Sequence, residues 1–165
     1  MRTRISIVMV AAAVMALSIS GVALADNITG TQGPDVLTGT LFDDHIVGKK
    51  GDDQISGLAG NDNIAGNKGN DLLNGDEGND TLSGKKGADQ INGGPGNDVI
   101  YARGDGKKSG PDTITCGEDP VEEYALPDND TVFADKNDVV ADDCENIDRT
   151  GNNKPHPSHP NGPKS

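Results

Sequence analysis

Residues 30–101 read, in groups of nine, as GTQGPDVLT, GTLFDDHIV, GKKGDDQIS, GLAGNDNIA, GNKGNDLLN, GDEGNDTLS, GKKGADQIN and GGPGNDVIY. Position 1 is Gly, position 6 is Asp and position 8 is Leu or Ile in all eight units. Position 4 is Gly in every unit except the second, where Phe42 stands. Columns that keep one phase from Gly30 to Tyr101 define a tandem repeat, whose units must stack to bury their apolar side chains.

The chemistry of each column predicts the local structure of one unit. Glycines at positions 1 and 4 permit positive φ and a close approach of neighbouring backbones, so we expect the first six residues to form a turn. The last three form a short strand, with the aliphatic residue at position 8 facing inward and positions 7 and 9 facing solvent. Two units return the chain over itself, which predicts an all-β solenoid with two nonapeptides per coil.

Stacking of the coils places the position 6 carboxylates in two columns. One column holds Asp35, Asp53, Asp71 and Asp89, and the other holds Asp44, Asp62, Asp80 and Asp98. Such columns repel unless a cation lies between the coils. Ca²⁺ suits carboxylate and carbonyl oxygens in a loose geometry, whereas Mg²⁺ demands a stricter octahedron. Transition metals favour His or Cys, and the eight units contain one His and no Cys. We therefore predict about six Ca²⁺ ions between coils, against the alternative that the columns are a solvated acidic edge.

The unit resembles the G-G-x-G-x-D-x-U-x nonapeptide of the repeats-in-toxin (RTX), or haemolysin-type, calcium-binding proteins. The resemblance implies a right-handed parallel β-roll in which each ion lies between repeats n and n+2. It implies ligands from the eight aspartates and from turn carbonyls at positions 2 and 4. The position 4 candidates are Gly51, Gly60, Gly69, Gly78, Gly87 and Gly96. The chain departs from the family pattern at position 2, which is Gly only at Gly94, and in the first two turns, where Pro34 and Phe42 stand.

The repeat continues in degenerate form after Tyr101. A five-residue insertion, 102–106, precedes KKSGPDTIT, in which Asp112 and Ile114 occupy positions 6 and 8. Asp112 is thus a further candidate ligand. Asp130 stands two unit lengths later in the same phase, which predicts one full coil between the two aspartates. We interpret 102–149 as a degenerate repeat followed by a polar C-terminal cap over the last coil.

The chain has two cysteines, Cys116 and Cys144, and both lie in this C-terminal region. An even count in an exported chain predicts one intramolecular disulfide that tethers the cap. Two free thiols are the alternative.

The two ends of the chain differ from the repeats. Residues 1–25 combine Arg2 and Arg4, an apolar run over 5–17 and the cleavage pattern Ala23-Leu24-Ala25, which predicts a secretory signal peptide rather than an uncleaved membrane anchor. Cleavage there would remove two arginines and lower the net charge from -13 to -15. The roll would then occupy 26–101. Residues 150–165 are polar and predict a disordered tail.

The charge balance limits the partners. Asp and Glu outnumber Lys and Arg by 27 to 14, the wrong sign for nucleic acid or an anionic membrane. The pairs Lys49-Lys50, Lys85-Lys86 and Lys107-Lys108 are interpreted as solvated, with a polyanion patch as the alternative.

These features predict a secreted, extracellular calcium-binding protein that acts as a scaffold or interaction module with a protein or glycan partner. The alternatives are a glycan- or surface-binding adhesion module and an accessory part of a secreted enzyme system. We predict that the protein is not an enzyme, because the chain has no HExxH and no G-x-S-x-G motif. The oligomeric state stays open.

Overall fold

The computed structural model describes residues 26–103, 110–117 and 129–149, and the regular secondary structure in these ranges is entirely β-strand. The predicted signal peptide, the predicted tail and Lys107-Lys108 lie outside the described residues. No helix in the described ranges is long and apolar enough to cross a membrane. The strands are β1 (Asn27–Thr29), β2 (Val36–Thr38), β3 (His45–Lys50), β4 (Gln54–Ala59), β5 (Asn63–Lys68), β6 (Leu72–Glu77), β7 (Thr81–Lys86), β8 (Gln90–Asn92), β9 (Val99–Tyr101), β10 (Thr113–Thr115), β11 (Thr131–Phe133), β12 (Val139–Val140) and β13 (Asn146–Asp148).

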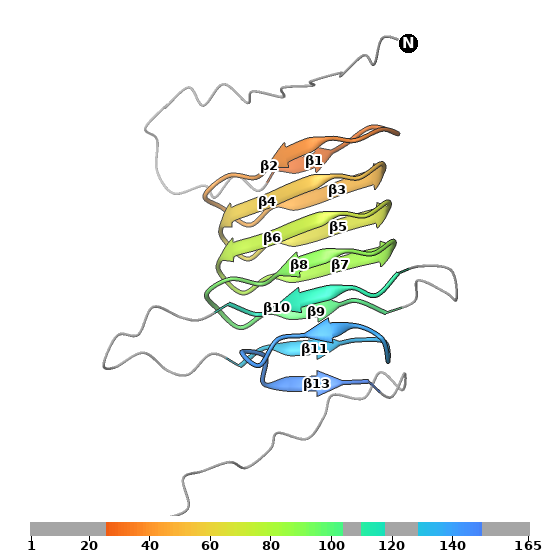
Figure 1. Ribbon diagram of the computed structural model, residues 1–165. Coiled ribbons are helices and arrows are strands. Elements are labelled where there is room, and N and C mark those ends of the chain that lie inside the picture. The colour runs from red at the N-terminus through yellow and green to blue at the C-terminus, as the bar shows by residue number, and fades with distance from the viewer. Residues whose placement is uncertain (1–25, 104–109, 118–128, 150–165) are drawn as a thin grey trace, which may run out of the picture.

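The strands form two parallel sheets that alternate along the chain (Figure 1). The odd-numbered strands β1 to β13 lie in sequence order in one sheet, and the even-numbered strands β2 to β12 form the other. Within the repeats each strand pairs with the strand two units further along the chain, as in Ile46 opposite Ile64 and Ile64 opposite Leu82. The predicted all-β fold, a parallel β-roll with two nonapeptides per coil, is confirmed.

The core between the sheets consists of one aliphatic side chain from each unit. Position 8 supplies Leu37, Ile46, Ile55, Ile64, Leu73, Leu82, Ile91 and Ile100, and Ile114 and Val132 extend the row. Each of these side chains is at most 8% exposed, whereas Val36 at position 7 is 71% exposed. The prediction that position 8 faces inward is confirmed. The core is a narrow row, so other interactions must help to hold the coils together.

The strands β3 to β7 are longer than predicted. Each has six residues and continues past position 9 into positions 1–3 of the next unit. The expected six-residue turn is therefore wrong for these units, and positions 4–6 alone form the turn. The reason is that pairing between coils persists around the corner, where Lys49 lies opposite Asn67 and Lys50 opposite Lys68.

Positive φ occurs at positions 2 and 4, not at positions 1 and 4 as predicted. Position 2 is held by a residue other than Gly in five units with positive φ, including Leu58 at 81° and Asp76 at 69°. Position 4 requires Gly for two reasons: Gly69, for example, has φ of 130°, and a Cβ there would overlap the carbonyl oxygen of Gly51 in the preceding coil.

Replacing Leu58 by Gly is expected to raise the free energy of unfolding by about 0.5–1 kcal/mol. A side chain in the left-handed region costs roughly 1–2 kcal/mol, and part of that gain is offset by the greater freedom of Gly in the unfolded chain. Leu58 is 39% exposed, so little packing is lost. The control is Leu72→Gly, at a similarly exposed strand position without positive φ, which should destabilise by about 0.5–1 kcal/mol. Calcium-loaded thermal unfolding of both variants provides the measurement, and two equal shifts would contradict the strain argument.

The roll begins with β1, before the first complete nonapeptide at Gly30. Asp26 and β1 form half a unit, in which Ile28 packs against the core cluster. The order Asp-x-Ile-x over 26–29 repeats positions 6–9 of the nonapeptide.

The C-terminal part continues the two sheets, but the number of residues between paired strands is no longer constant. β10 pairs with β8, but β11 pairs with β9 in the opposite sheet. The prediction of one full coil between Asp112 and Asp130 is therefore wrong. β10 ends at Thr115 and β11 begins at Thr131 in the other sheet, so here the two unit lengths from Asp112 to Asp130 cover only half a coil.

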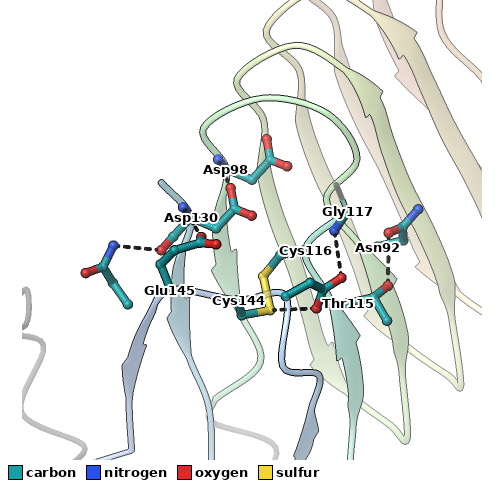
Figure 2. The surroundings of a disulfide bond; sticks show 10 residues. Asn92, Asp98, Thr115, Cys116, Gly117, Asp130, Cys144 and Glu145 are labelled. Carbon is teal, nitrogen blue, oxygen red and sulfur yellow. Dashed lines mark hydrogen bonds between the residues drawn. A yellow bond between two sulfur atoms is a disulfide. The ribbon is translucent and has the colours of Figure 1, made fainter. Parts of the chain in front are cut away.

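The predicted disulfide between Cys116 and Cys144 is confirmed, with their Cα atoms 5.2 Å apart (Figure 2). It joins the end of β10 to the turn before β13. In the chain-entropy model a loop of this length contributes roughly 3–4 kcal/mol by restricting the unfolded chain. Arg103 adds a salt bridge to Asp148 at 3.0 Å, and both side chains are largely buried. The C-terminal coils are thus fixed by covalent and ionic contacts in addition to a short apolar row.

Candidate metal centre

The position 6 aspartates stand directly before the strands, at the two edges of the roll. One column precedes the even-numbered strands and contains Asp35, Asp53, Asp71, Asp89, Asp112 and Asp138. The other precedes the odd-numbered strands and contains Asp26, Asp44, Asp62, Asp80, Asp98 and Asp130, followed by Glu145. The eight aspartates named as candidate ligands are each at most 8% exposed, and Asp112 is fully buried. The structure therefore brings the predicted residues together in the two predicted columns.

From the second coil onward, one oxygen of each column carboxylate joins neighbouring coils. Asp71 Oδ1 accepts a hydrogen bond from the backbone N–H of Asp53 at 2.9 Å, and the N–H of Asp71 donates to Asp89 Oδ1 at 2.9 Å. The same contact continues past the regular repeats, where the Asp112 N–H donates to Asp138 Oδ1 and the Asp130 N–H to Glu145 Oε2. Asp138 and Glu145 are not among the residues predicted from the sequence, although both precede an apolar residue by two positions.

The second oxygen is buried without a hydrogen-bond partner in the middle of the roll. This holds for Oδ2 of Asp53, Asp62, Asp71, Asp80 and Asp89. A buried carboxylate oxygen without a partner is costly, because burial removes water and nothing replaces it. The arrangement therefore calls for a ligand that interacts favourably with anionic oxygen.

Position 1 glycines create the space next to these oxygens. A Cβ on Gly48 would overlap Asp53 Oδ2, and the carbonyl oxygen of Gly66 in the next coil lies 2.9 Å from the same point. Gly57 has the same surroundings, with Asp62 Oδ2 and the carbonyl of Gly75. Position 1 is thus Gly because a carboxylate oxygen and a main-chain carbonyl converge there. This glycine was predicted for its positive φ and for a close approach of backbones, and its carbonyl was not among the predicted ligands.

The position 4 glycines, whose carbonyls were predicted as ligands, lie deeper in the turn. Their carbonyls approach the position 4 glycine of the next coil, as Gly51 does with Gly69. A Cβ on Gly87 would contact the carbonyl oxygen of Gly69 and Asp89 Oδ1. The Gly69 carbonyl is therefore near Oδ1 of Asp89, whereas the position 1 carbonyls are near Oδ2.

The donor set fits Ca²⁺. It consists of carboxylate and main-chain carbonyl oxygens, the hard ligands that calcium accepts in a flexible geometry. Within the described ranges no three His, Cys, Asp or Glu side chains form a cluster that could hold a metal ion. Each coil contributes one aspartate to each column, so a calcium ion here must take much of its coordination from backbone carbonyls.

The two candidate aspartates nearest the N-terminus, Asp35 and Asp44, differ from those in the middle. Asp35 Oδ2 accepts hydrogen bonds from the N–H of Thr31 at 2.5 Å and from its hydroxyl at 3.1 Å. Asp44 Oδ2 accepts a hydrogen bond from the N–H of Thr40 at 2.5 Å. Their second oxygens are already hydrogen-bonded, so these two aspartates offer fewer oxygens to a cation than those further along the roll.

Burial raises the pKa of the central aspartates. The pKa of Asp80 and of Asp89 rises to about 7, and that of Asp62 and of Asp71 to about 6. Loss of solvation is the main cause, the hydrogen bond from the preceding coil opposes it, and the charges of adjacent aspartates in the column add to it. Without a cation, the folded roll thus favours protonated carboxyls.

The calcium-free protein is expected to be more stable in mild acid than at neutral pH. The pKa values of these aspartates are higher in the folded chain than the value of about 3.9 in an unfolded chain. Protonation therefore stabilises the folded form fully below about pH 4, and this contribution is lost as pH rises through about 6 to 7. Circular dichroism of the calcium-free protein between about pH 5 and 8 checks the direction. The variant Asp80→Asn/Asp89→Asn should show a flatter dependence, and stability that increases with pH would contradict the assignment.

A second ladder of hydrogen bonds runs along the turn at position 5. The N–H of Asn61 donates to Asp43 Oδ1 at 2.7 Å, that of Asn79 to Asn61 Oδ1 at 3.0 Å, and that of Asn97 to Asn79 Oδ1 at 2.8 Å. These contacts connect successive coils without a metal. Their signal in the sequence is the asparagine that recurs at position 5 in four units.

Comparison with known families decides the identity of the repeat. The model described as RTX calcium-binding nonapeptide repeat (4 copies) matches residues 20–41, 38–73 and 74–106, which together are just over half of the chain. The chain belongs to the RTX calcium-binding nonapeptide repeat family. No curated protein and no solved structure matches it.

This RTX protein is therefore a calcium-binding repeat protein, and calcium as its predicted ion is confirmed at the level of the family. The number of ions and the ligand role of each aspartate stay predictions. Within the RTX repeats, the buried Oδ2 atoms identify the coils from Asp53 to Asp89 as those best suited to hold ions.

Proposed function

We propose that this protein is a secreted calcium-binding scaffold whose roll folds around ions stacked between its coils. The observation that carries the proposal is the set of buried Oδ2 atoms without partners in a repeat of the calcium-binding family. Asp53, Asp62, Asp71, Asp80 and Asp89 supply the best side-chain ligands. Asp98 and Asp112 extend the columns, and Asp35 and Asp44 form weaker sites toward the N-terminal end of the roll.

Calcium supplies the positive charge that the two columns lack. Three features of the chain prepare the ion sites. Position 1 glycines leave room at Oδ2, and the strands fix the spacing of the coils. The hydrogen bonds to Oδ1 orient each carboxylate. About six ions, each between two coils, would offset most of the charge of the chain.

An extracellular location is supported by two features. The first is the predicted signal peptide, and the second is the disulfide between Cys116 and Cys144, since disulfides persist in oxidising compartments. We further propose that the protein has no catalytic activity of its own and serves as a rigid extracellular module. The chain has neither of the metalloprotease and serine hydrolase motifs sought in its sequence.

Counting bound ions tests this function directly. We expect equilibrium dialysis in millimolar calcium, followed by elemental analysis, to yield about six Ca²⁺ per chain. Mg²⁺ at equal concentration should not displace them, because it demands a stricter octahedron. A chain that retains fewer than two calcium ions, or exchanges them for Mg²⁺, would contradict the proposal.

A further inference from the structure

Lysine side chains gather where β3, β5 and β7 end. Lys49 and Lys50 end β3, Lys68 ends β5, and Lys85 and Lys86 end β7. These ends lie at the same edge of the roll (Figure 1). Together with Gln32 and Asn67, the five lysines line an open groove with a volume of about 450 Å³.

The parallel register arranges three of these lysines in a regular column. Lys50 lies opposite Lys68, and Lys68 lies opposite Lys86. Neighbouring strands are about 4.8 Å apart, so the column presents positive charges at an even spacing along the axis of the roll. All three lysines are exposed. The groove is therefore a linear array of ammonium groups that are free to approach a ligand.

Folding alone does not account for this array. Like charges directly opposite one another destabilise a sheet. In the described ranges the only salt bridge is Arg103 with Asp148, so no carboxylate pairs with these lysines there. Five of the eight Lys and Arg residues of those ranges lie in this groove, in a chain with net charge -13. The opposite edge of the roll has no lysine at the corresponding turn positions.

Calcium would change the charge of this edge. The aspartate column of Asp35, Asp53, Asp71 and Asp89 belongs to the same turns, with Asp53 three residues after Lys50 and Asp71 three residues after Lys68. Without a cation, these carboxylates offset the lysines. With calcium in the column, the carboxylates are neutralised and the edge has a net positive charge, which attracts anions.

We propose that the groove binds a linear anionic polysaccharide when the roll is loaded with calcium. This inference rests on the proposed calcium-dependent fold. An evenly spaced row of lysines fits a polymer that repeats one negative group per sugar unit. Gln32 and Asn67 supply amides for hydrogen bonds to hydroxyl groups. The groove has no aromatic side chain, so it lacks the stacking surface that single-stranded nucleic acid uses.

Binding of dextran sulfate to the whole protein in millimolar calcium tests the proposal. The variant Lys50→Gln/Lys68→Gln/Lys86→Gln is expected to weaken binding by at least about tenfold and to reduce its salt dependence. The matched control is Leu41→Glu/Lys136→Glu, which changes the net charge by the same amount at exposed positions outside the groove. It should change the affinity by less than about twofold. Neutral dextran should not bind.

Two further outcomes separate the explanations. Equal loss in the lysine variant and the control would mean that only net charge matters, and tighter binding of an oligothymidylate would assign the groove to nucleic acid; each result overturns the proposal. Circular dichroism and the hydrodynamic radius of every variant are recorded with calcium. A wild-type protein that does not fold with calcium refutes the proposed function itself, whereas a folded protein that fails to bind dextran sulfate refutes the groove alone.

Discussion

Removal of calcium is expected to expand the protein and abolish most of its β-sheet signal. The radius of gyration should rise roughly two- to threefold, the difference between a compact and an unfolded chain of this length. The physical reason is that one aliphatic side chain per unit forms the core, while the buried Oδ2 atoms of the central aspartates Asp53 to Asp89 accept no hydrogen bond within the described part of the chain. Without a cation, the charges of each column also repel one another along the roll.

Small-angle scattering and far-UV circular dichroism, with chelator and then with excess calcium, provide the measurement. We expect full reversal with a midpoint around 10⁻⁴ to 10⁻³ M, the range of extracellular calcium modules. Mg²⁺ is the control and should not restore the compact form. A chelator-treated sample with an unchanged radius and spectrum would contradict the calcium-dependent roll.

The features predictable from the sequence are those that depend on a single position of the nonapeptide. The inward row at position 8 follows from alternation in a strand, which is why Ile46 and Ile64 are found opposite each other as expected. The aspartate columns follow from the repeat length. The pairing of Cys116 with Cys144 follows from the even number of cysteines together with the predicted signal peptide.

The features that escaped prediction depend on contacts between coils. The role of Gly48 is visible only when Asp53 Oδ2 and the next coil's carbonyl are placed beside it. Similarly, the length of β3 is set by its pairing with β5, and not by its own residues. The sheet to which Asp130 belongs depends on how much chain the connection before it uses, which spacing alone does not determine. Sequence periodicity thus predicts the architecture, whereas the ligand geometry needs the stacked backbone.

Replacing Asp71 is expected to weaken calcium-induced folding far more than replacing Asp35. Asp71 lies between Asp53 and Asp89 in its column, and its Oδ2 has no partner in the protein. It can therefore serve the ions on both sides. Asp35 has a neighbour on one side only, and Thr31 already donates to its Oδ2. Asp71→Ala should raise the calcium midpoint by about tenfold, corresponding to about 1.4 kcal/mol, and lower the cooperativity, while Asp35→Ala should shift it less than about twofold.

Alanine also removes a hydrogen-bond acceptor, so a third variant separates the two roles of Asp71. Asp71→Asn retains a carbonyl oxygen for the Asp53 N–H but replaces the anionic oxygen by an amide. If Asp71 is a calcium ligand, Asn should raise the midpoint nearly as much as Ala. The calcium-free form of the Asn variant should become more stable than that of the wild type, because one charge is lost from a repelling column and the acceptor is kept. Calcium titrations followed by circular dichroism measure all three variants. A wild-type midpoint in Asp71→Asn would mean that the carboxylate acts only as a hydrogen-bond acceptor between coils, and equal curves for the Asp71 and Asp35 variants would refute the shared-ligand arrangement.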